Sequence, residues 1–283
     1  MKTFEISNEF LHVTLSDFGG EMTSVKFLGV ERLWNGNPEF WKRHAPFLFP
    51  IVGSLKGGKT VISGSEYHMN QHGLCRIFTH EVVEKSDSSI TFYFASSEET
   101  LKAYPYEFEF FTKYTLIGKK IEIIITIKNK GEDELLCSVG GHPAFVNLYD
   151  GDTLDNYEIV FEKSEKSLQQ LLIKDALYYK NVAREEIKVV PTSEKSLNDT
   201  IIFSGFESDY VSLVRKGTGE KVSVSLGGHT LIAFWKGEGA PFICLEPWNG
   251  IADPYEFSGK FEDKPYMEKI EDEKEYDFSM IFE

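Results

Sequence analysis

The sequence of 283 residues contains little cysteine and no long apolar run. The number of cysteines is odd and they form no C-x-x-C pair, which favours reduced core residues over a disulfide framework: Cys75, Cys137 and Cys244. No apolar run approaches the roughly 20 residues that a membrane-spanning helix needs. The first residues hold one lysine and two glutamates with no apolar segment after them, so no signal peptide is expected. These absences predict a cytoplasmic protein.

Basic residues are also scarce. Lysine and arginine number 30 against 45 aspartates and glutamates, which gives a formal net charge of −15 at pH 7. Nucleic acids and anionic membranes are themselves negative and would repel such a surface. We therefore expect neither nucleic acid nor membrane as a partner.

Alternating apolar residues are the dominant pattern that is present. Hydrophobic residues make up 41% of the chain and aromatic residues 14%, enough for a sizeable core. The clearest strand covers residues 121–129, where every second residue is isoleucine. Similar runs occur at 157–161, 210–214, 222–226 and 231–235. With glycine and proline between them and one good short helix, at 97–104, they predict a large antiparallel β-sandwich that forms one domain over residues 1–283.

Three further segments have local signals. Gly57-Gly58 indicates a hairpin turn beside strands at 60–62 and 67–69. Residues 41–53 mix aromatic residues, basic residues and two prolines, which indicates an irregular strand beside a cleft. After Pro247 the chain becomes acidic, and we expect it to be irregular to the end.

One stretch places a histidine on a stiff backbone. In Ser138-Val139-Gly140-Gly141-His142-Pro143, two glycines permit a tight turn or a close approach of the backbone to another group. Pro143 restricts His142 to an extended conformation. A titratable imidazole at a strand end suits acid–base chemistry at neutral pH. The alternative is a structural histidine bonded to the backbone.

A second stretch repeats this arrangement with a carboxylate. Glu246 follows the apolar run 242–245 and precedes Pro247. Partial burial would raise its pKa and make it a usable base. The alternative is a carboxylate that accepts hydrogen bonds from backbone amides at the strand end. Trp248, two residues later, offers a flat apolar face.

Three segments in this order resemble the aldose 1-epimerase (galactose mutarotase) family. They are His72-Gly73, Gly141-His142-Pro143-Ala144-Phe145 and Leu245-Glu246-Pro247-Trp248. The likeness is greatest to the LacX-like branch, where H-G-F-A-R, G-G-H-P-A-F and E-P-W segments are typical. It extends from about Phe4 to the C-terminal region, and the ordered set is more specific than any one segment.

The resemblance implies a β-supersandwich with a sugar cleft on one face. It implies that Glu246 takes the proton of the anomeric hydroxyl and that His142 protonates the ring oxygen. His72 matches a further histidine of the family, one that contacts sugar hydroxyls. One base and one acid suffice for this reaction, so neither a metal nor a cofactor is expected. The expected partner is a monosaccharide, bound by a monomer or homodimer.

Further residues are candidates for substrate binding. Arg76 falls on the arginine of the H-G-F-A-R segment, and Arg43 lies near a basic position of this group. Either guanidinium suits hydroxyls or a phosphate on C6 of the sugar, while a surface ion pair is the alternative for both. Asp209 is a candidate for binding hydroxyls, and sugars stack on faces such as that of Trp248. The remaining histidines show no metal-site spacing and are interpreted as structural: His12, His44, His68, His80 and His229.

Two departures from the family pattern leave the sugar open. Galactose mutarotases usually have a G-R pair after the P-I-V segment, but Gly53 is followed here by Ser54. Leu74-Cys75 replaces Phe-Ala in the H-G-F-A-R segment. Galactose or glucose is the first expectation. The alternatives are a hexose 6-phosphate epimerase and a non-catalytic carbohydrate-binding or sensing protein. A glycoside hydrolase normally needs a carboxylate pair, and only one well-placed carboxylate is evident.

Overall fold

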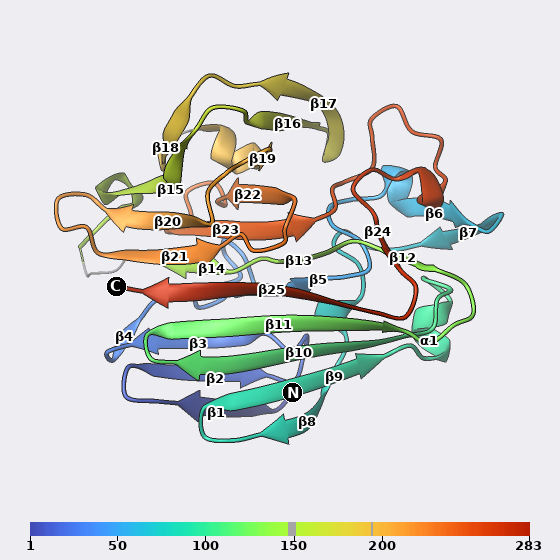
Figure 1. The fold of residues 1–283 in the computed structure, drawn as a ribbon, viewed down its shortest axis with the longest axis horizontal. Helices are drawn as coiled ribbons and strands as arrows, with labels where there is room; N and C mark the ends of the chain where they lie inside the picture. Colours follow the sequence, from blue (N-terminus) through green and yellow to red (C-terminus); the bar gives the residue numbers. More distant parts are fainter. Residues whose placement is uncertain (147–150, 194) are drawn as a thin grey trace.

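The structure, a computed structural model, describes residues 1–146, 151–193 and 195–283. Over these residues the chain is almost entirely antiparallel β-sheet (Figure 1), which confirms the predicted all-β class. The single α-helix in this part of the chain is α1 (Glu98–Leu101), and Ser97 caps it as expected by accepting a hydrogen bond from the Thr100 amide. No described helix combines the length and apolarity that crossing a membrane requires.

Two large sheets account for most of the described strands. The larger sheet has nine strands in the order β18 (Ile187–Pro191), β15 (Tyr157–Glu165), β20 (Tyr210–Arg215), β21 (Lys221–Ser225), β25 (Glu273–Phe282), β11 (Lys120–Asn129), β10 (Phe108–Ile117), β9 (Ser89–Ala95) and β8 (Glu81–Lys85). The second sheet runs in the order β17 (Leu177–Ala183), β16 (Gln169–Lys174), β19 (Ile201–Ser204), β22 (Leu231–Trp235), β23 (Phe242–Asn249), β13 (Val139–Gly141) and β5 (Phe47–Leu48), with β14 (Ala144–Val146) also paired to β23.

Three smaller sheets complete the described fold. One contains β1 (Thr3–Ser7), β2 (Leu11–Ser16), β3 (Met22–Phe27) and β4 (Val30–Glu31). The other two are pairs: β6 (Lys59–Ile62) with β7 (Ser65–His68), and β12 (Leu135–Cys137) with β24 (Glu268–Ile270). Short 3-10 turns lie at Lys56–Gly58, Cys75–Ile77, Leu154–Asn156, Lys195–Asp199 and Phe261–Asp263.

The main hydrophobic core lies between the nine-stranded sheet and its neighbours. The alternate isoleucines of β11 are fully buried, as the period of two predicts: Ile121, Ile123, Ile125 and Ile127. Phe161 of β15 meets Phe203 and Phe234 of the second sheet at ring-centroid distances of 6.1 and 5.8 Å. At the other end, Phe4 of β1 meets Phe92 of β9 at 5.9 Å. One long sheet therefore supports two shorter ones.

The structure overturns two local expectations. The turn of the β6–β7 hairpin is the two-residue loop Ser63-Gly64, because Ile62 pairs with Ser65. Gly57-Gly58 instead precedes β6 in a 3-10 turn. The chain beyond Pro247 is also not irregular to its end, since β24 and the ten-residue β25 lie there.

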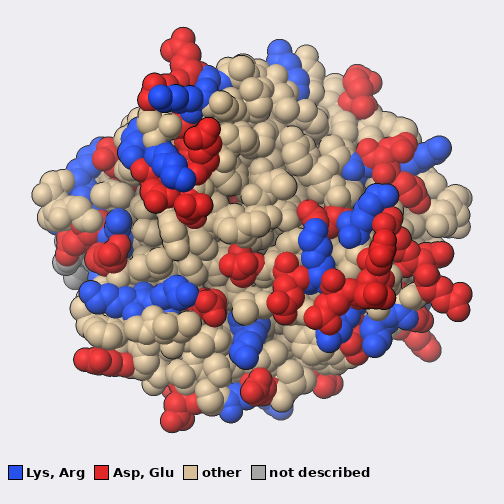
Figure 2. Space-filling view, viewed as in Figure 1, with Lys and Arg blue, Asp and Glu red and all other residues tan. Residues whose placement is uncertain are grey.

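The space-filling view in Figure 2 shows charges of both signs on the face of the molecule seen in Figure 1, with acidic side chains frequent toward α1 and β24.

Candidate active site

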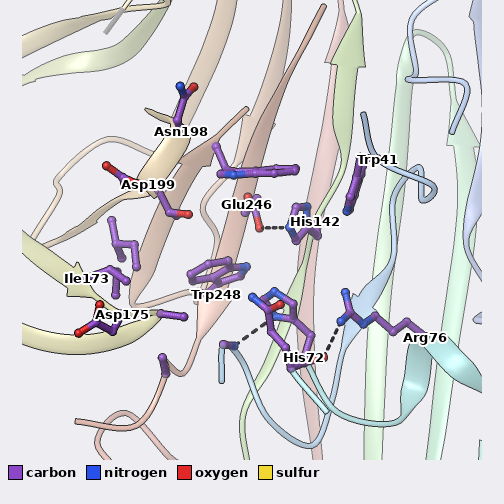
Figure 3. A pocket seen from close by; sticks show the side chains of 17 residues that line it. Trp41, His72, Arg76, His142, Ile173, Asp175, Asn198, Asp199, Glu246 and Trp248 are labelled. Carbon is purple, nitrogen blue, oxygen red and sulfur yellow. Dashed lines mark hydrogen bonds and ion pairs between the residues drawn. The ribbon is translucent and has the colours of Figure 1, made fainter. Parts of the chain in front are cut away.

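A pocket of about 580 Å³ opens over the β13–β23 part of the second sheet. Figure 3 shows that its side chains come from several separate segments. One wall carries residues that the sequence singled out, namely His72, Arg76, His142, Glu246 and Trp248. The opposite wall in Figure 3 carries Ile173, Asp175, Asn198 and Asp199, and Ala176 and Thr200 also line the pocket. The pocket therefore brings together His142 and Glu246, which are 104 positions apart in the chain.

The alternation of β23 places Glu246 in the pocket. Ile243 and Leu245 point into the main core, so the alternate residues Cys244 and Glu246 face the opposite side of the sheet. Glu246 is fully buried between β22 and β13. Neither of its carboxylate oxygens has a hydrogen-bond partner among the described residues. This observation contradicts the alternative of a carboxylate that accepts hydrogen bonds from backbone amides.

His142 approaches Glu246 from the end of β13. Its Nε2 lies 3.0 Å from Oε2 of Glu246 (Figure 3), although the contact is not aligned as a hydrogen bond. The ring of Trp41 stacks on the imidazole with centroids 4.8 Å apart and an interplanar angle of 26°. Trp235 meets the same ring edge-on at 5.8 Å. Aromatic packing thus fixes the imidazole plane beside the carboxylate.

Burial shifts the pKa of each member of this pair in the direction that favours the uncharged form of the side chain. It raises the pKa of Glu246 well above its ordinary value, while the nearby Arg76 charge acts in the opposite direction. It lowers the pKa of His142 to about 3, and Arg76 adds to that shift. The ion pair and the uncharged pair each hold one proton in total. The His142–Glu246 pair can therefore change between these two forms by moving its one proton, without taking a proton from bulk water.

His72 is held rigidly at the pocket wall. Its Nδ1 accepts a hydrogen bond from the Gly53 amide at 3.1 Å, and its own amide donates to the Gly53 carbonyl at 2.9 Å. His72 adopts φ of +65°, a left-handed conformation that is uncommon for a non-glycine residue. Since Nδ1 accepts, the neutral ring carries its proton on Nε2. Burial lowers the pKa of His72 and keeps the ring in this neutral form.

The two candidate arginines have different environments. Arg76 lines the pocket, donates from one terminal nitrogen to the Gln71 carbonyl at 2.5 Å, and keeps Nε without a partner among the described residues. Burial lowers its pKa to about 10. Arg43 donates from Nη1 to the Arg76 carbonyl at 2.7 Å and is not part of the lining. Arg43 therefore supports the backbone of Arg76, and Arg76 alone faces the pocket.

Trp248 lies in the pocket, but Asp209 does not. Trp248 is 5% exposed, and its indole N–H has no partner in the part of the chain that the structure describes. Asp209 is exposed and forms an ion pair with Lys163 at 3.6 Å. It is absent from the pocket lining, so the structure does not bring it together with the other candidates, and its binding of sugar hydroxyls stays a prediction. A serine–aspartate–tyrosine sequence does not reveal which way a loop residue faces.

Several residues that line the pocket are not distinguished by the sequence alone. Trp41 and Trp235 flank His142, and Asp175, Asn198 and Asp199 form the far wall (Figure 3). The sequence does give an indication for Trp41, because it lies in the segment 41–53, which is predicted to border a cleft. Asp175 is at the β16–β17 turn and Asp199 ends a 3-10 turn, both exposed. Exposed polar loops are common, and nothing local distinguished these two.

The double glycine before His142 is required by close packing. A Cβ on Gly140 would lie 2.5 Å from Cδ1 of Trp248 and 2.9 Å from the Pro247 carbonyl oxygen. A Cβ on Gly141 would lie 2.5 Å from the Phe278 ring. The close approach that the sequence suggested is therefore present at both glycines.

We expect Gly140→Ala to displace Trp248 and to destabilise the protein by about 1–3 kcal/mol, the usual cost of overpacking. Urea unfolding followed by circular dichroism measures this change. Gly131→Ala is the control, because its nearest neighbour would be Oδ1 of Asn129 at 3.6 Å. Equal urea midpoints for the two variants would contradict the packing argument.

Comparison with known proteins gives the family. A model of the aldose 1-epimerase family matches residues 2–250. Protein LacX (plasmid) of Lactococcus lactis subsp. lactis is 30% identical over 298 residues, which cover 99% of this chain and 99% of that protein. The structure of a galactose mutarotase related enzyme from Lactobacillus acidophilus is 31% identical with a TM-score of 0.95, and the match covers 100% of this chain and 97% of the other.

A second solved structure has the same fold at lower identity. A galactose mutarotase-like protein from Lactobacillus casei is 24% identical with a TM-score of 0.92, and the match covers 100% of both chains. The match to the family spans the pocket residues His72, His142 and Glu246. The chain belongs to the aldose 1-epimerase family.

Proposed function

We propose that the protein is a mutarotase that interconverts the α and β anomers of a free hexose, with galactose or glucose as substrate. One observation carries this proposal: a histidine nitrogen and an unpartnered, fully buried carboxylate oxygen lie 3.0 Å apart in a pocket. Buried polar groups are normally paired, and a sugar that brings hydroxyl groups and a ring oxygen supplies the missing partners.

The proposed reaction uses the single proton that His142 and Glu246 hold between them. With the sugar bound, the Glu246 carboxylate accepts the proton of the anomeric hydroxyl while the His142 imidazolium protonates the ring oxygen. The bond between C1 and the ring oxygen breaks, and the C1 carbonyl forms. Both groups are then uncharged, which is the state that burial favours. Rotation about C1–C2 and the reverse proton transfers close the ring as the other anomer.

Three further residues bind and orient the sugar in this proposal. His72 presents Nε2–H as a donor, since its Nδ1 is occupied by the Gly53 amide. Trp248 supplies an apolar face and an unpartnered indole N–H. Arg76 supplies an unpartnered Nε–H and lies close enough to lower the pKa of Glu246. Donors of this kind stabilise negative charge that develops on substrate oxygens.

The arginine arrangement favours a free sugar over a hexose 6-phosphate. A phosphate site is expected to have two cations that face one point, because the guanidinium fork binds phosphate in pairs of hydrogen bonds. Only Arg76 lines the described pocket, while Arg43 binds a backbone carbonyl. The far wall adds two carboxylates, Asp175 and Asp199. These negative charges oppose a phosphate.

We expect Arg76→Ala to raise KM for galactose by roughly 10–100-fold with a smaller change in kcat, since a hydrogen bond from a charged group contributes about 1.5–3 kcal/mol. Arg43→Ala is the comparison and is expected to have a smaller effect, because Arg43 acts through the backbone of Arg76. Initial rates over a range of galactose concentrations measure both values. A KM unchanged in Arg76→Ala would remove Arg76 from the binding set.

Asp175 and Asp199 also bear on the hydrolase alternative. Glycosidases place two carboxyl groups on either side of the scissile bond. In Figure 3 the group opposite Glu246 is His142, and both aspartates lie across the pocket from His142. Both are exposed, whereas Glu246 is fully buried. The geometry therefore supports a carboxylate–imidazole pair, which suits ring opening better than glycoside cleavage.

Polarimetry of freshly dissolved α-D-galactose and α-D-glucose tests the proposal. The protein is expected to speed the approach to anomeric equilibrium above the spontaneous rate, and heat-treated protein is the control. Exchange NMR on galactose 6-phosphate in parallel tests the phosphorylated alternative. Acceleration with the phosphorylated sugar alone would reassign the substrate. No acceleration with any of these sugars would favour the non-catalytic binding protein.

A further inference from the structure

We propose that His142, Cys244 and Glu246 form a site for a thiophilic divalent cation of the zinc class, and that an ion bound there blocks sugar turnover. A ring nitrogen of His142, Sγ of Cys244 and a carboxylate oxygen of Glu246 all lie within 4.8 Å of one another. Imidazole, thiolate and carboxylate are the ligand types of zinc sites. The metal-binding step does not depend on the proposed epimerase activity.

The strand geometry explains why these three side chains meet. Cys244 and Glu246 are two residues apart on β23, so their side chains leave the same face of the sheet. Ala144 of β14 pairs directly with Cys244. His142 lies two residues before Ala144, between β13 and β14, and thus reaches the same point from the neighbouring strand.

The distances are close to those of a tetrahedral site. Typical zinc bonds of about 2.0–2.3 Å place ligand atoms about 3.3–3.6 Å apart at tetrahedral angles. Nε2 of His142 and Oε2 of Glu246 are already 3.0 Å apart. The widest separation in the group is at most 4.8 Å. Side-chain shifts of about an ångström therefore complete three ligands, and water from the pocket that His142 and Glu246 line would be the fourth.

Charge and hydrogen bonding favour occupancy by a dication. A thiolate, a carboxylate and a neutral imidazole together balance a charge of plus two, so the buried centre is neutral. The Glu246 oxygens have no hydrogen-bond partner among the described residues, and Nδ1 of His142 also has none there. Cys244 is a buried free cysteine. On binding, the thiol proton passes to solvent and the sulfur becomes a ligand.

The same atoms serve the acid–base pair and the metal site. An ion that holds Nε2 of His142 and an oxygen of Glu246 leaves neither group free to exchange a proton with sugar. Sugar and ion therefore compete, and saturating galactose is expected to weaken metal binding. Zinc is expected to inhibit the wild type, and a chelator is expected to restore the rate.

Titration with Co²⁺ tests the site without any activity measurement. The wild type is expected to show a near-ultraviolet thiolate-to-cobalt charge-transfer band, with displacement by Zn²⁺. Cys244→Ser is expected to lose the band and to bind Co²⁺ at least ~10–100-fold more weakly, since even outer-shell changes cost that much. Cys137→Ser is the matched control, because Cys137 is an equally buried free thiol on β12.

The outcomes separate the metal site from the proposed function. No band in the wild type, or no binding tighter than about 1 mM, would overturn the site, as would a band that persists in Cys244→Ser. Cys244→Ala replaces the serine variant if the buried hydroxyl disturbs folding. A band without galactose turnover leaves the metal site standing and removes the epimerase. Equal zinc inhibition of wild type and Cys244→Ser would overturn the blocking role.

Discussion

Glu246→Gln is expected to lower the catalysed rate of galactose anomer interconversion by roughly 10²–10⁴-fold, the usual contribution of a general base. Glutamine keeps the size of the side chain and can still bind a hydroxyl, but it cannot accept the anomeric proton. KM is therefore expected to change little while kcat falls. Polarimetry for the slow reaction and exchange NMR at equilibrium measure the rate by two independent routes.

The same variant is expected to keep or gain stability. Both Glu246 oxygens lack hydrogen-bond partners among the described residues, so glutamine removes a buried carboxylate that accepts no hydrogen bond there. Glu165 is the matched control. It is equally buried, but its carboxylate accepts from the amides of Glu207 and Ser208 at 2.7 and 2.9 Å. Glu165→Gln is expected to lose about 1–3 kcal/mol and to keep the rate.

Comparing Glu246→Gln with Glu165→Gln distinguishes a catalytic role of a buried carboxylate from a structural one. A loss of stability in Glu246→Gln without a loss of rate would assign Glu246 a structural role. A near wild-type rate in folded Glu246→Gln would reject it as the base. Urea midpoints and polarimetric rates from one preparation give both results.

His142→Ala is the second variant with a large expected effect, again roughly 10²–10⁴-fold in kcat. The truncation removes the proposed acid beside Glu246 and leaves a space next to the Trp41 ring. Added imidazole is expected to restore part of the rate by occupying that space as a diffusible acid. Rescue that depends on imidazole concentration separates an acid–base role from a merely structural one.

His68→Ala serves as the control for this variant. His68 is exposed on β7, and its ring nitrogen Nε2 lies 3.2 Å from a carboxylate oxygen of Glu66. Its removal is expected to leave the rate unchanged, with or without imidazole. A His142→Ala protein that is folded and fully active would require another proton donor to the ring oxygen.

The fold was predictable because burial in a sandwich imposes a period of two. The isoleucines of β11 show the pattern without interruption, and all are buried. The same period is present in β25, where Tyr276, Phe278, Met280 and Phe282 are buried. Its first residues are exposed charges, which made this segment resemble an acidic tail. The acidic composition led to a wrong prediction for a segment whose alternation is that of a strand.

The site was predictable where residue type and backbone constraint coincide. His142 and Glu246 each precede a proline at an apolar segment, and the structure brings them together. The far wall was not predictable, because Asp175 and Asp199 depend on how distant loops meet. Asp209 is the opposite case: its residue type suits the binding of sugar hydroxyls, but it is exposed and does not line the pocket. Local sequence specifies a side chain's chemistry but not the neighbours that long-range folding supplies.

The position of β25 has a consequence for synthesis on the ribosome. This strand lies between β11 and β21 (Figure 1), yet it follows every other strand of the nine-stranded sheet in the sequence. Until residue 282 has emerged, the nascent chain holds two half-sheets whose inner edges have no partner. Unpaired edges are templates for pairing with other chains. Protection of the growing polypeptide is therefore needed until this strand has emerged and paired with both edges.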